Sequence, residues 1–169
     1  MHQDFLPLGI AVLTGAGISK ESGIDTFRDE GGLWTQVDLE EVATIEAWFR
    51  NKKKVLDFYN DTRRSFRAAG IVPNAAHEAL ARLEREYEGE VTIITQNIDL
   101  LHEQAGSRRV LHMHGRDGEV RCMACQTVFT SDDDLTPQSV CPTCKVAGEL
   151  RPNIVWFGEM PLHLEEIYQ

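Results

Sequence analysis

The chain has no apolar run of about 18 residues, so we expect no helix that spans a membrane. Its first residues lack the basic stretch that begins a signal peptide, which favours a cytoplasmic protein. Positive charge is also scarce, because 17 Lys and Arg residues stand against 27 Asp and Glu residues, for a formal net charge of −10. We therefore expect no direct contact with nucleic acid or with an anionic membrane, since both are negatively charged.

Four apolar runs predict buried strands, at residues 8–13, 91–95, 110–113 and 153–157. Helical patterns lie between the first two runs, at residues 45–49, 55–66 and 75–87, and Asn74 is suited to cap the last of them. Strands that alternate with helices indicate an α/β fold with a Rossmann-like, mainly parallel sheet, which is incomplete in 169 residues. Each run ends in glycine or polar residues, and ligands of open α/β sheets bind at the carboxyl ends of the strands.

The cysteines form two Cys-x-x-Cys pairs that are separated by 15 residues. Two such pairs let four thiolates converge on one tetrahedral zinc ion and leave no open coordination position, so we expect a structural metal. A zinc-dependent nucleobase deaminase would carry a proline directly before the first cysteine of a pair, whereas Pro142 follows Cys141, and a nucleic-acid-binding zinc ribbon would be basic. The expected zinc ligands are Cys122, Cys125, Cys141 and Cys144.

The segment around these cysteines differs in composition from the rest of the chain. Residues 119–150 contain few large apolar side chains, so we expect this segment to need its metal in order to fold. The acidic run at residues 132–134 is expected to be a solvent-exposed loop. The predicted organisation is a first part of the Rossmann-like domain at residues 1–118, a zinc-binding module at 119–150 and a return into the first domain at 151–169.

A glycine loop, Gly15-Ala16-Gly17, follows the first predicted strand. Such a loop lets the backbone approach a phosphate closely at the start of a helix. The dinucleotide-binding fingerprint requires a third glycine where this chain has Lys20. By itself, the loop therefore does not support a plain nicotinamide-dependent dehydrogenase.

Several longer motifs occur together in this chain. They are the glycine loop with its continuation to Arg28 and Gly32-Leu33-Trp34, the string Thr95-Gln96-Asn97-Ile98-Asp99, the pair His114-Gly115, the four-cysteine module, and Val155-Trp156-Phe157-Gly158-Glu159. In combination they resemble the sirtuin family of NAD-dependent protein deacylases. Thr26-Phe27-Arg28 and Ala43-Thr44 are similar to the bacterial branch and its relatives that remove acidic acyl groups. Family members continue well past 169 residues, so we expect a C-terminally truncated chain that is inactive alone.

The resemblance implies that NAD binds the Rossmann-like domain and that an acyl-lysine protein or peptide lies between this domain and the zinc module. It implies that the acyl oxygen attacks C1′ of the nicotinamide ribose, that nicotinamide leaves, and that His114 acts as general base on a ribose hydroxyl. The products are then free lysine, nicotinamide and O-acyl-ADP-ribose. A histidine suits this role because its pKa lies near physiological pH. The alternatives are an ADP-ribosyltransferase with the same NAD-cleaving site and a catalytically inactive binding module.

The resemblance also implies roles for individual residues. The expected NAD contacts are Gly15, Ala16, Gly17, Phe27, Arg28, Gln96, Asn97 and Asp99. The expected substrate contacts are Ala43, Tyr59, Thr62, Val155 and Trp156, of which the last two would pair with the peptide as an extended strand. His112, Trp34 and Trp48 are expected to be structural.

The acyl pocket departs from the acid-removing branch at one position. In that branch an alanine, a tyrosine and an arginine three residues after the tyrosine line the pocket; Ala43 and Tyr59 match, but the third residue is Thr62. Arg63 is rotated by about 100° along a helix and is expected to point away. A succinyl carboxylate would then lack a guanidinium partner. We therefore predict a deacetylase, with desuccinylase or demalonylase specificity as the alternative.

Overall fold

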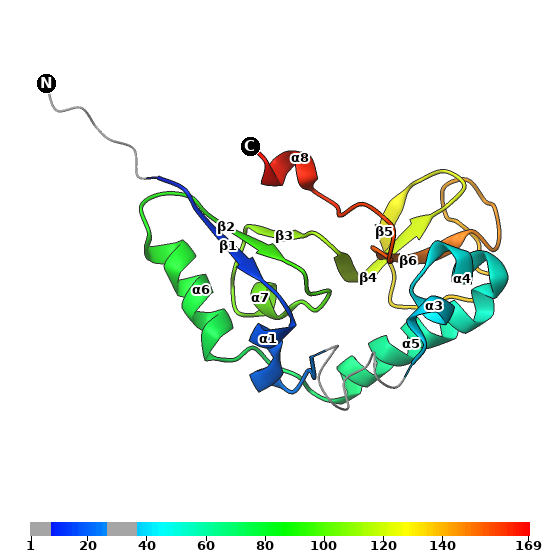
Figure 1. Cartoon of the computed structure of the whole chain (residues 1–169), viewed down its shortest axis with the longest axis horizontal. Coiled ribbons are helices and arrows are strands. Elements are labelled where there is room, and N and C mark those ends of the chain that lie inside the picture. The colour runs from blue at the N-terminus through cyan, green and yellow to red at the C-terminus, as the bar shows by residue number, and fades with distance from the viewer. Residues whose placement is uncertain (1–7, 27–36) are drawn as a thin grey trace, which may run out of the picture.

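The computed structural model describes residues 8–26 and 37–169. The predicted site residues Phe27 and Arg28, and also Trp34, lie outside the described residues. The described chain forms two neighbouring parts, a parallel sheet with short helices and an antiparallel sheet that is flanked by three consecutive helices (Figure 1). An α/β fold with a parallel sheet and a separate cysteine-bearing module is thereby confirmed.

The parallel sheet contains strands β1 (Ile10–Thr14), β2 (Val91–Thr95) and β3 (Val110–His112), in that order. Thr14 lies opposite Thr95, and Thr95 lies opposite His112, so the three strands end at one edge of the sheet. The polar residues that follow the strands are therefore brought together, as the sequence predicts. The other elements of this part are α1 (Ala16–Ser19), a 3₁₀ turn (Lys20–Ser22), α6 (Ala75–Glu86) and α7 (Leu101–Gln104).

Helix α6 begins at a complete cap. The Asn74 side chain accepts a hydrogen bond from the Ala76 N–H at 3.0 Å, and the Asn74 N–H donates to His77 Nδ1 at 3.3 Å. This cap satisfies backbone donors that the first turn of a helix leaves free. The Asn74 amide also donates to the Ile18 carbonyl at 2.7 Å, which ties the start of α6 to the glycine-loop segment.

The antiparallel sheet contains β4 (Gly115–Cys122), β5 (Val128–Thr130) and β6 (Leu150–Ile154), in the order β5-β4-β6. The strand predicted at residues 153–157 is wrong in position and partner, because β6 ends at Ile154 and pairs with β4. The apolar residues after Ile154 enter a tight turn instead, in which the Glu159 N–H donates to the Trp156 carbonyl. The predicted boundary between residues 118 and 119 falls inside β4.

Three helices cover this second sheet: α3 (Leu39–Val42), α4 (Ile45–Arg50) and α5 (Lys52–Ala68). Trp48 and Trp156 are 0% and 2% exposed, and their rings lie 6.0 Å apart. The cysteine segment has few large apolar residues of its own, as the sequence predicts, and most of the core beside it comes from helices far earlier in the chain. The buried residues of this core are Val42, Ala43, Ala47, Trp48, Val55, Leu56, Tyr59, Val120, Cys122, Leu135, Cys141, Leu150 and Trp156.

The acidic run at residues 132–134 is an exposed loop, as the sequence predicts, and it is also bonded to α5. The Arg63 guanidinium donates to the Asp133 carbonyl at 2.6 Å and to Asp134 at 3.2 Å. Arg67 donates to Asp132 at 2.6 Å. These bonds fasten the loop to α5, and they direct the Arg63 side chain away from the cavity described below.

The described chain ends in a short helix, α8 (Leu164–Ile167). None of the helices that the structure describes combines enough length and enough apolar character to cross a lipid bilayer.

Candidate functional site

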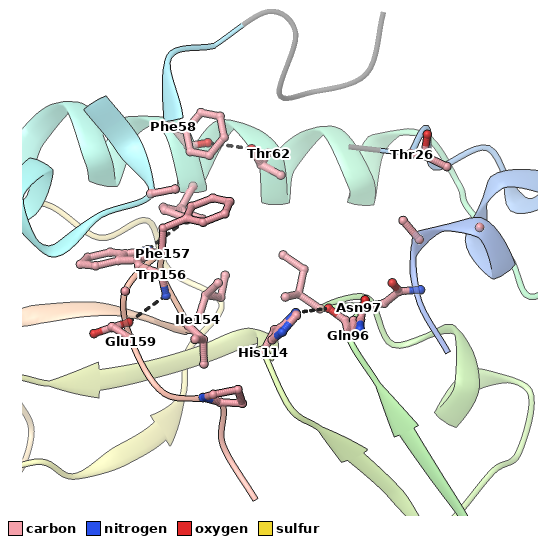
Figure 2. Close-up of a pocket in the computed structure, with 18 residues that line it drawn as sticks. Thr26, Phe58, Thr62, Gln96, Asn97, His114, Ile154, Trp156, Phe157 and Glu159 are labelled. Atoms are coloured by element: carbon pink, nitrogen blue, oxygen red, sulfur yellow. Dashed lines mark hydrogen bonds between the residues drawn. The ribbon is translucent and has the colours of Figure 1, made fainter. Parts of the chain in front are cut away.

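A cavity of about 560 Å³ lies between the carboxyl edge of the parallel sheet and helix α5. Figure 2 shows Gln96, Asn97 and His114 at one side of this space, with Phe58 and Thr62 on α5 at the other. The cavity joins residues that the sequence assigned to the cofactor, to the base and to the substrate. Of the predicted site residues, the lining includes Ala16, Gly17, Ala43, Tyr59, Thr62, Gln96, Asn97, His114, Val155 and Trp156.

His114 follows strand β3 and is oriented by the turn after β2. Its Nδ1 lies 3.2 Å from the Gln96 carbonyl oxygen (Figure 2). Because a carbonyl oxygen only accepts hydrogen bonds, Nδ1 must carry the proton that is shared between these atoms. In the neutral ring, Nε2 then holds a free lone pair, and His114 has the tautomer of a proton acceptor.

Gly115 lets the second sheet approach this histidine. Its φ is +88°, and a Cβ at this position would lie 2.0 Å from the Asn153 carbonyl oxygen. Only glycine avoids both the strained backbone and the overlap. The close approach allows the Val155 N–H to donate to the His114 carbonyl at 2.9 Å, which brings the segment after β6 to the cavity.

Asn97 is held almost completely out of solvent. Its side-chain amide donates to the Gly15 carbonyl at 3.1 Å and to Ser19 Oγ at 3.0 Å, and Ser19 Oγ donates to Asp99 Oδ2 at 2.9 Å. Gly15 and Asp99 therefore lie behind the cavity wall rather than on it. The other side-chain atom of Asn97, Oδ1, is buried and has no partner among the described residues. A buried acceptor of this kind requires a donor, which a polar ligand would supply.

Two buried histidines lie behind the sheet edge. His102 is 0% exposed, its Nε2 lies 2.9 Å from Thr14 Oγ1, and its ring centroid is 4.9 Å from that of His77. Burial, together with the neighbouring His77, lowers the pKa of His102 to about 4. Both rings are therefore neutral packing groups at physiological pH, which supports the strand that leads into the glycine loop.

His112 is the residue that sequence reasoning underestimated. Its Nδ1 lies 2.9 Å from the Asn97 carbonyl oxygen, and its Nε2 lies 2.8 Å from Glu103 Oε1. Burial acts to lower its pKa, but the bond to Glu103, the charge of Glu103 and the Asn97 carbonyl together raise it. The only sequence signal was its position two residues before His114, and this spacing does not indicate the contacts with Asn97 and Glu103.

The wall formed by α5 is uncharged. Thr62 Oγ1 donates to the Phe58 carbonyl at 2.9 Å, and the Tyr59 hydroxyl accepts a hydrogen bond from Trp156 Nε1 at 3.0 Å. Burial raises the pKa of Tyr59, so the phenol remains neutral. No Lys or Arg is found among the described residues that line the cavity.

The third wall is rigid because a buried arginine supports it. The Arg151 guanidinium lies 3.2 Å from the ring centroid of Trp156 and donates to both carboxylate oxygens of Glu159, at 2.8 and 2.9 Å. Glu159 also accepts the Trp156 N–H at 2.8 Å. The turn that places Val155 and Trp156 beside the cavity is therefore held by charge, hydrogen bonds and ring packing.

The four cysteines form a second centre, away from the cavity lining. Cys122 Sγ lies 3.7 Å from Cys144 Sγ, and Cys125 Sγ lies 3.8 Å from Cys141 Sγ. All four sulfur atoms lie within 4.8 Å of one another. A tetrahedral zinc ion with bonds of about 2.3 Å separates its sulfur ligands by roughly 3.8 Å. The donor set and spacing therefore fit a structural zinc ion with four thiolate ligands.

The two cysteine pairs are built alike. The Gln126 N–H donates to the Cys122 carbonyl at 2.9 Å, and the Lys145 N–H donates to the Cys141 carbonyl at 3.0 Å. Gln126 and Lys145 have φ values of 61° and 63°. Two equivalent turns thus present four sulfur atoms to one point.

A histidine beside a cavity at the edge of a parallel sheet, together with a four-cysteine cluster that fits zinc, is typical of ligand-binding α/β proteins with a structural metal site. Residues 15–169 match the model of the Sir2 family, and the chain belongs to that family. The sirtuin resemblance drawn from the sequence is thereby confirmed.

The chain is similar to proteins named NAD-dependent protein deacylase. It is 55% identical over 160 residues to the SIR2rp3 protein of Trypanosoma brucei brucei, and this alignment covers 94% of this chain and 66% of that protein. It is 52% identical over 160 residues to a protein of Bdellovibrio bacteriovorus, which covers 95% of this chain and 68% of that protein. The chain thus spans about two thirds of the length of these relatives.

Solved structures give the same assignment. A mutant Sir2 homologue in complex with ADP-ribose matches with a TM-score of 0.79 at 42% identity, over 91% of this chain and 60% of that one. A Sir2 homologue in complex with NAD matches with a TM-score of 0.74 at 43% identity, over 90% of this chain and 58% of that one. A Sir2 mutant with a deacetylated p53 peptide and 3′-O-acetyl-ADP-ribose matches with a TM-score of 0.72 at 33% identity, over 91% and 62%.

Proposed function

We propose that the protein is an NAD-dependent protein-lysine deacylase that forms free lysine, nicotinamide and O-acyl-ADP-ribose. The observation that carries the proposal is that one cavity joins the oriented base His114, the unsatisfied acceptor of Asn97 and the neutral wall of α5. The names of the relatives and the contents of the similar structures support the same activity.

The residues at the sheet edge fit NAD. A Cβ on Gly17 would have no neighbour within 4 Å, so the backbone there is open to close approach by a phosphate. Asn97 Oδ1 needs a donor, which a ribose hydroxyl or the nicotinamide carboxamide would supply. When bound, NAD supplies an electrophilic ribose carbon and a leaving group. We assign Ala16, Gly17, Gln96 and Asn97 to direct contact with it, Gly15 and Asp99 to support behind them, and Phe27 and Arg28, which lie outside the described residues, to further contacts.

His114 takes the proton in this proposal. Its Nδ1–H is committed to the Gln96 carbonyl, so Nε2 is the atom that accepts a proton from a ribose hydroxyl. The protein's part in the reaction is to hold this nitrogen toward the cavity and to return the ring to its neutral form after turnover.

The acyl-lysine peptide would lie along the segment after β6. The Val155 N–H is already bonded to the His114 carbonyl, and the Trp156 N–H is bonded to Glu159. An extended peptide would therefore pair with the Val155 carbonyl, and with the Trp156 carbonyl at the lone pair that the Glu159 N–H leaves free, as in recognition by strand addition. The acyl group would then enter the space lined by Ala43, Tyr59 and Thr62.

We further propose that neutral acyl groups, acetyl above all, are preferred over succinyl and malonyl. Thr62 already uses its hydroxyl proton on the Phe58 carbonyl, and the Arg63 guanidinium is bound to the acidic loop. A carboxylate in this pocket would meet no cationic partner among the described lining residues. Burial of a charge without its partner is costly.

The test is a panel of acetyl-, succinyl- and malonyl-lysine peptides incubated with and without NAD, followed by mass spectrometry and a nicotinamide assay. The longest natural form of the protein that contains residues 1–169 is used. We expect acyl loss with one nicotinamide released per lysine, and faster turnover of the acetyl peptide. A peptide that gains ADP-ribose would indicate the transferase alternative, and absence of NAD cleavage with every peptide would contradict the proposal.

A further inference from the structure

The turn after β2 is held at three consecutive carbonyl groups by residues from the end of β3, from the turn that follows it and from β4. All three turn residues line the cavity, so any shift of this turn would move the groups that face a ligand. The three bonds run from His114 Nδ1 to Gln96 O at 3.2 Å, from His112 Nδ1 to Asn97 O at 2.9 Å, and from the Asp117 N–H to Ile98 O at 2.7 Å.

The middle bond comes from a ring that uses both of its nitrogens. His112 is 6% exposed, with Nδ1 against a carbonyl oxygen and Nε2 at 2.8 Å from Glu103 Oε1. The carbonyl requires a proton on Nδ1, and an ionised Glu103 requires a second proton on Nε2. Only the imidazolium form satisfies both partners. The hydrogen bond and charge of His112 outweigh burial and hold the pKa of Glu103 below its usual value.

We propose that His112 is a positioning residue for the reaction: as an imidazolium paired with Glu103, it holds the Asn97 carbonyl and thereby the turn that carries Gln96, Asn97 and the partner of His114. The proposal rests on the proposed deacylase function for its kinetic readout. A charge-assisted hydrogen bond is shorter and stronger than a neutral one, so the turn is held most firmly while the ring is charged.

The electrostatic surroundings of His112 come from several elements. Glu103 on α7 is its direct partner, and Arg116 on β4 lies 3.9 Å from the same carboxylate oxygen. His102, also on α7, is neutral at physiological pH because its pKa is about 4. The groove beside His112 is also lined by Glu119, Arg121 and His163. Glu103 is thus the group whose removal changes the charge of His112 most directly.

Two substitutions separate the bond to Asn97 from the rest of the side chain. In Asn the amide nitrogen is attached to Cγ, as Nδ1 is in histidine, so His112→Asn keeps a donor for the Asn97 carbonyl. In Gln the amide is one atom further out, so the side chain of His112→Gln reaches toward Glu103 and loses the hydrogen bond to the Asn97 carbonyl. We expect His112→Gln to lower kcat about ten- to a hundredfold with little change in the KM for the peptide. We expect His112→Asn to retain most of the wild-type kcat.

A pH profile tests the charge. We expect the kcat of the wild type to fall at alkaline pH as His112 loses its proton, and Glu103→Gln to move this fall to lower pH. The matched control is Glu166→Gln, because His163 and Glu166 form a second His–Glu pair at 2.7 Å that is exposed and lies outside the turn. This control should leave the profile unchanged.

An NMR titration measures the protonation of the His112 ring without the need for enzymatic turnover. It should give a pKa above about 6.5 in the wild type and a lower pKa in Glu103→Gln. The proposal is overturned by wild-type kcat in His112→Gln, by an alkaline limb that Glu103→Gln does not move, or by a His112 pKa at or below 6.5. Failure of the wild type to cleave NAD with any acyl peptide would overturn the proposed function instead, and the titration would still decide whether the imidazolium exists.

Discussion

The two sides of the cavity are built by different means. The sheet-edge side is polar, and it is held by hydrogen bonds from buried His102, His112 and Asn97. The α5 side is held by the packing of Trp48, Tyr59 and Trp156 over the second sheet, close to the four cysteines. Polar contacts place single atoms for chemistry, whereas the packed side supplies most of the buried apolar surface. Loss of a polar group that faces the cavity should therefore change turnover, and loss of a packed side chain or of a thiolate should change folding.

The largest effect is expected from the loss of a thiolate. Cys144→Ala leaves three ligands around the metal, and zinc–thiolate binding supplies about 10 kcal/mol or more of folding free energy. We expect loss of zinc and of soluble protein together, measured by metal analysis and by yield after gel filtration. A zinc-free Cys144→Ala protein that remains folded would show that the aromatic core suffices without the metal.

The next largest effect is expected in the acyl pocket. Thr62→Arg places a guanidinium on the cavity face of α5 and should raise the ratio of kcat/KM for succinyl over acetyl peptide by tens- to thousandsfold, or about 2–5 kcal/mol. Asp61→Arg is the matched control, because Asp61 is exposed and is 69% accessible at its side chain. A wild type that already prefers succinyl would contradict the uncharged-pocket account, and so would a ratio that Thr62→Arg leaves unchanged.

Acid should weaken the sheet-edge side through His102. The folded-state pKa is about 4, below the usual value of about 6.5, so the unfolded chain binds more protons between these values. The stabilising contribution is complete above pH 6.5 and is lost as pH falls towards 4, on the order of 3 kcal/mol in total. Urea unfolding at several pH values should show this loss in the wild type. His102→Gln should lack it, and equal acid sensitivity of the two proteins would count against His102 as the source.

A surface ion pair provides the smallest effect and a baseline for the others. Lys53 and Asp57 lie 2.6 Å apart on α5, with side chains that are 71% and 53% exposed. Lys53→Ala should change the free energy of unfolding by less than about 0.5 kcal/mol and leave kcat unchanged. A larger change would show that surface charges, and not only the buried face, contribute substantially to the stability of α5.

The sequence was most informative where neighbours in the chain act together. Three apolar runs predicted parallel strands with a common edge, and Asn74 predicted the start of α6. The cysteine spacing predicted the metal centre because each pair lies within one turn. These features depend on local hydrogen bonds or on side-chain periodicity, which a sequence displays directly.

Features that depend on distant residues were missed. The core of the cysteine segment comes from α3, α4 and α5, and the acidic loop at 132–134 is fastened by Arg63 and Arg67. Trp156 is apolar because it packs against Tyr59 of α5, and not because it belongs to a parallel strand. No local pattern marks which earlier helix will cover a later sheet, and no pattern marked the bond from His112 to Asn97.

The substitution His114→Tyr tests the central claim most directly. The claim is that His114 takes part in the reaction, and that its loss abolishes activity while the α5 side of the cavity and the four-cysteine centre stay folded. The rate of acyl loss from an acetyl-lysine peptide with NAD and the zinc content should be measured on the same preparation of the variant. We predict that the rate falls by at least the 10²–10⁴-fold that is typical of a lost general base, with about one zinc ion per chain retained as in the wild type. Near-normal turnover, or loss of zinc together with activity, would contradict the account.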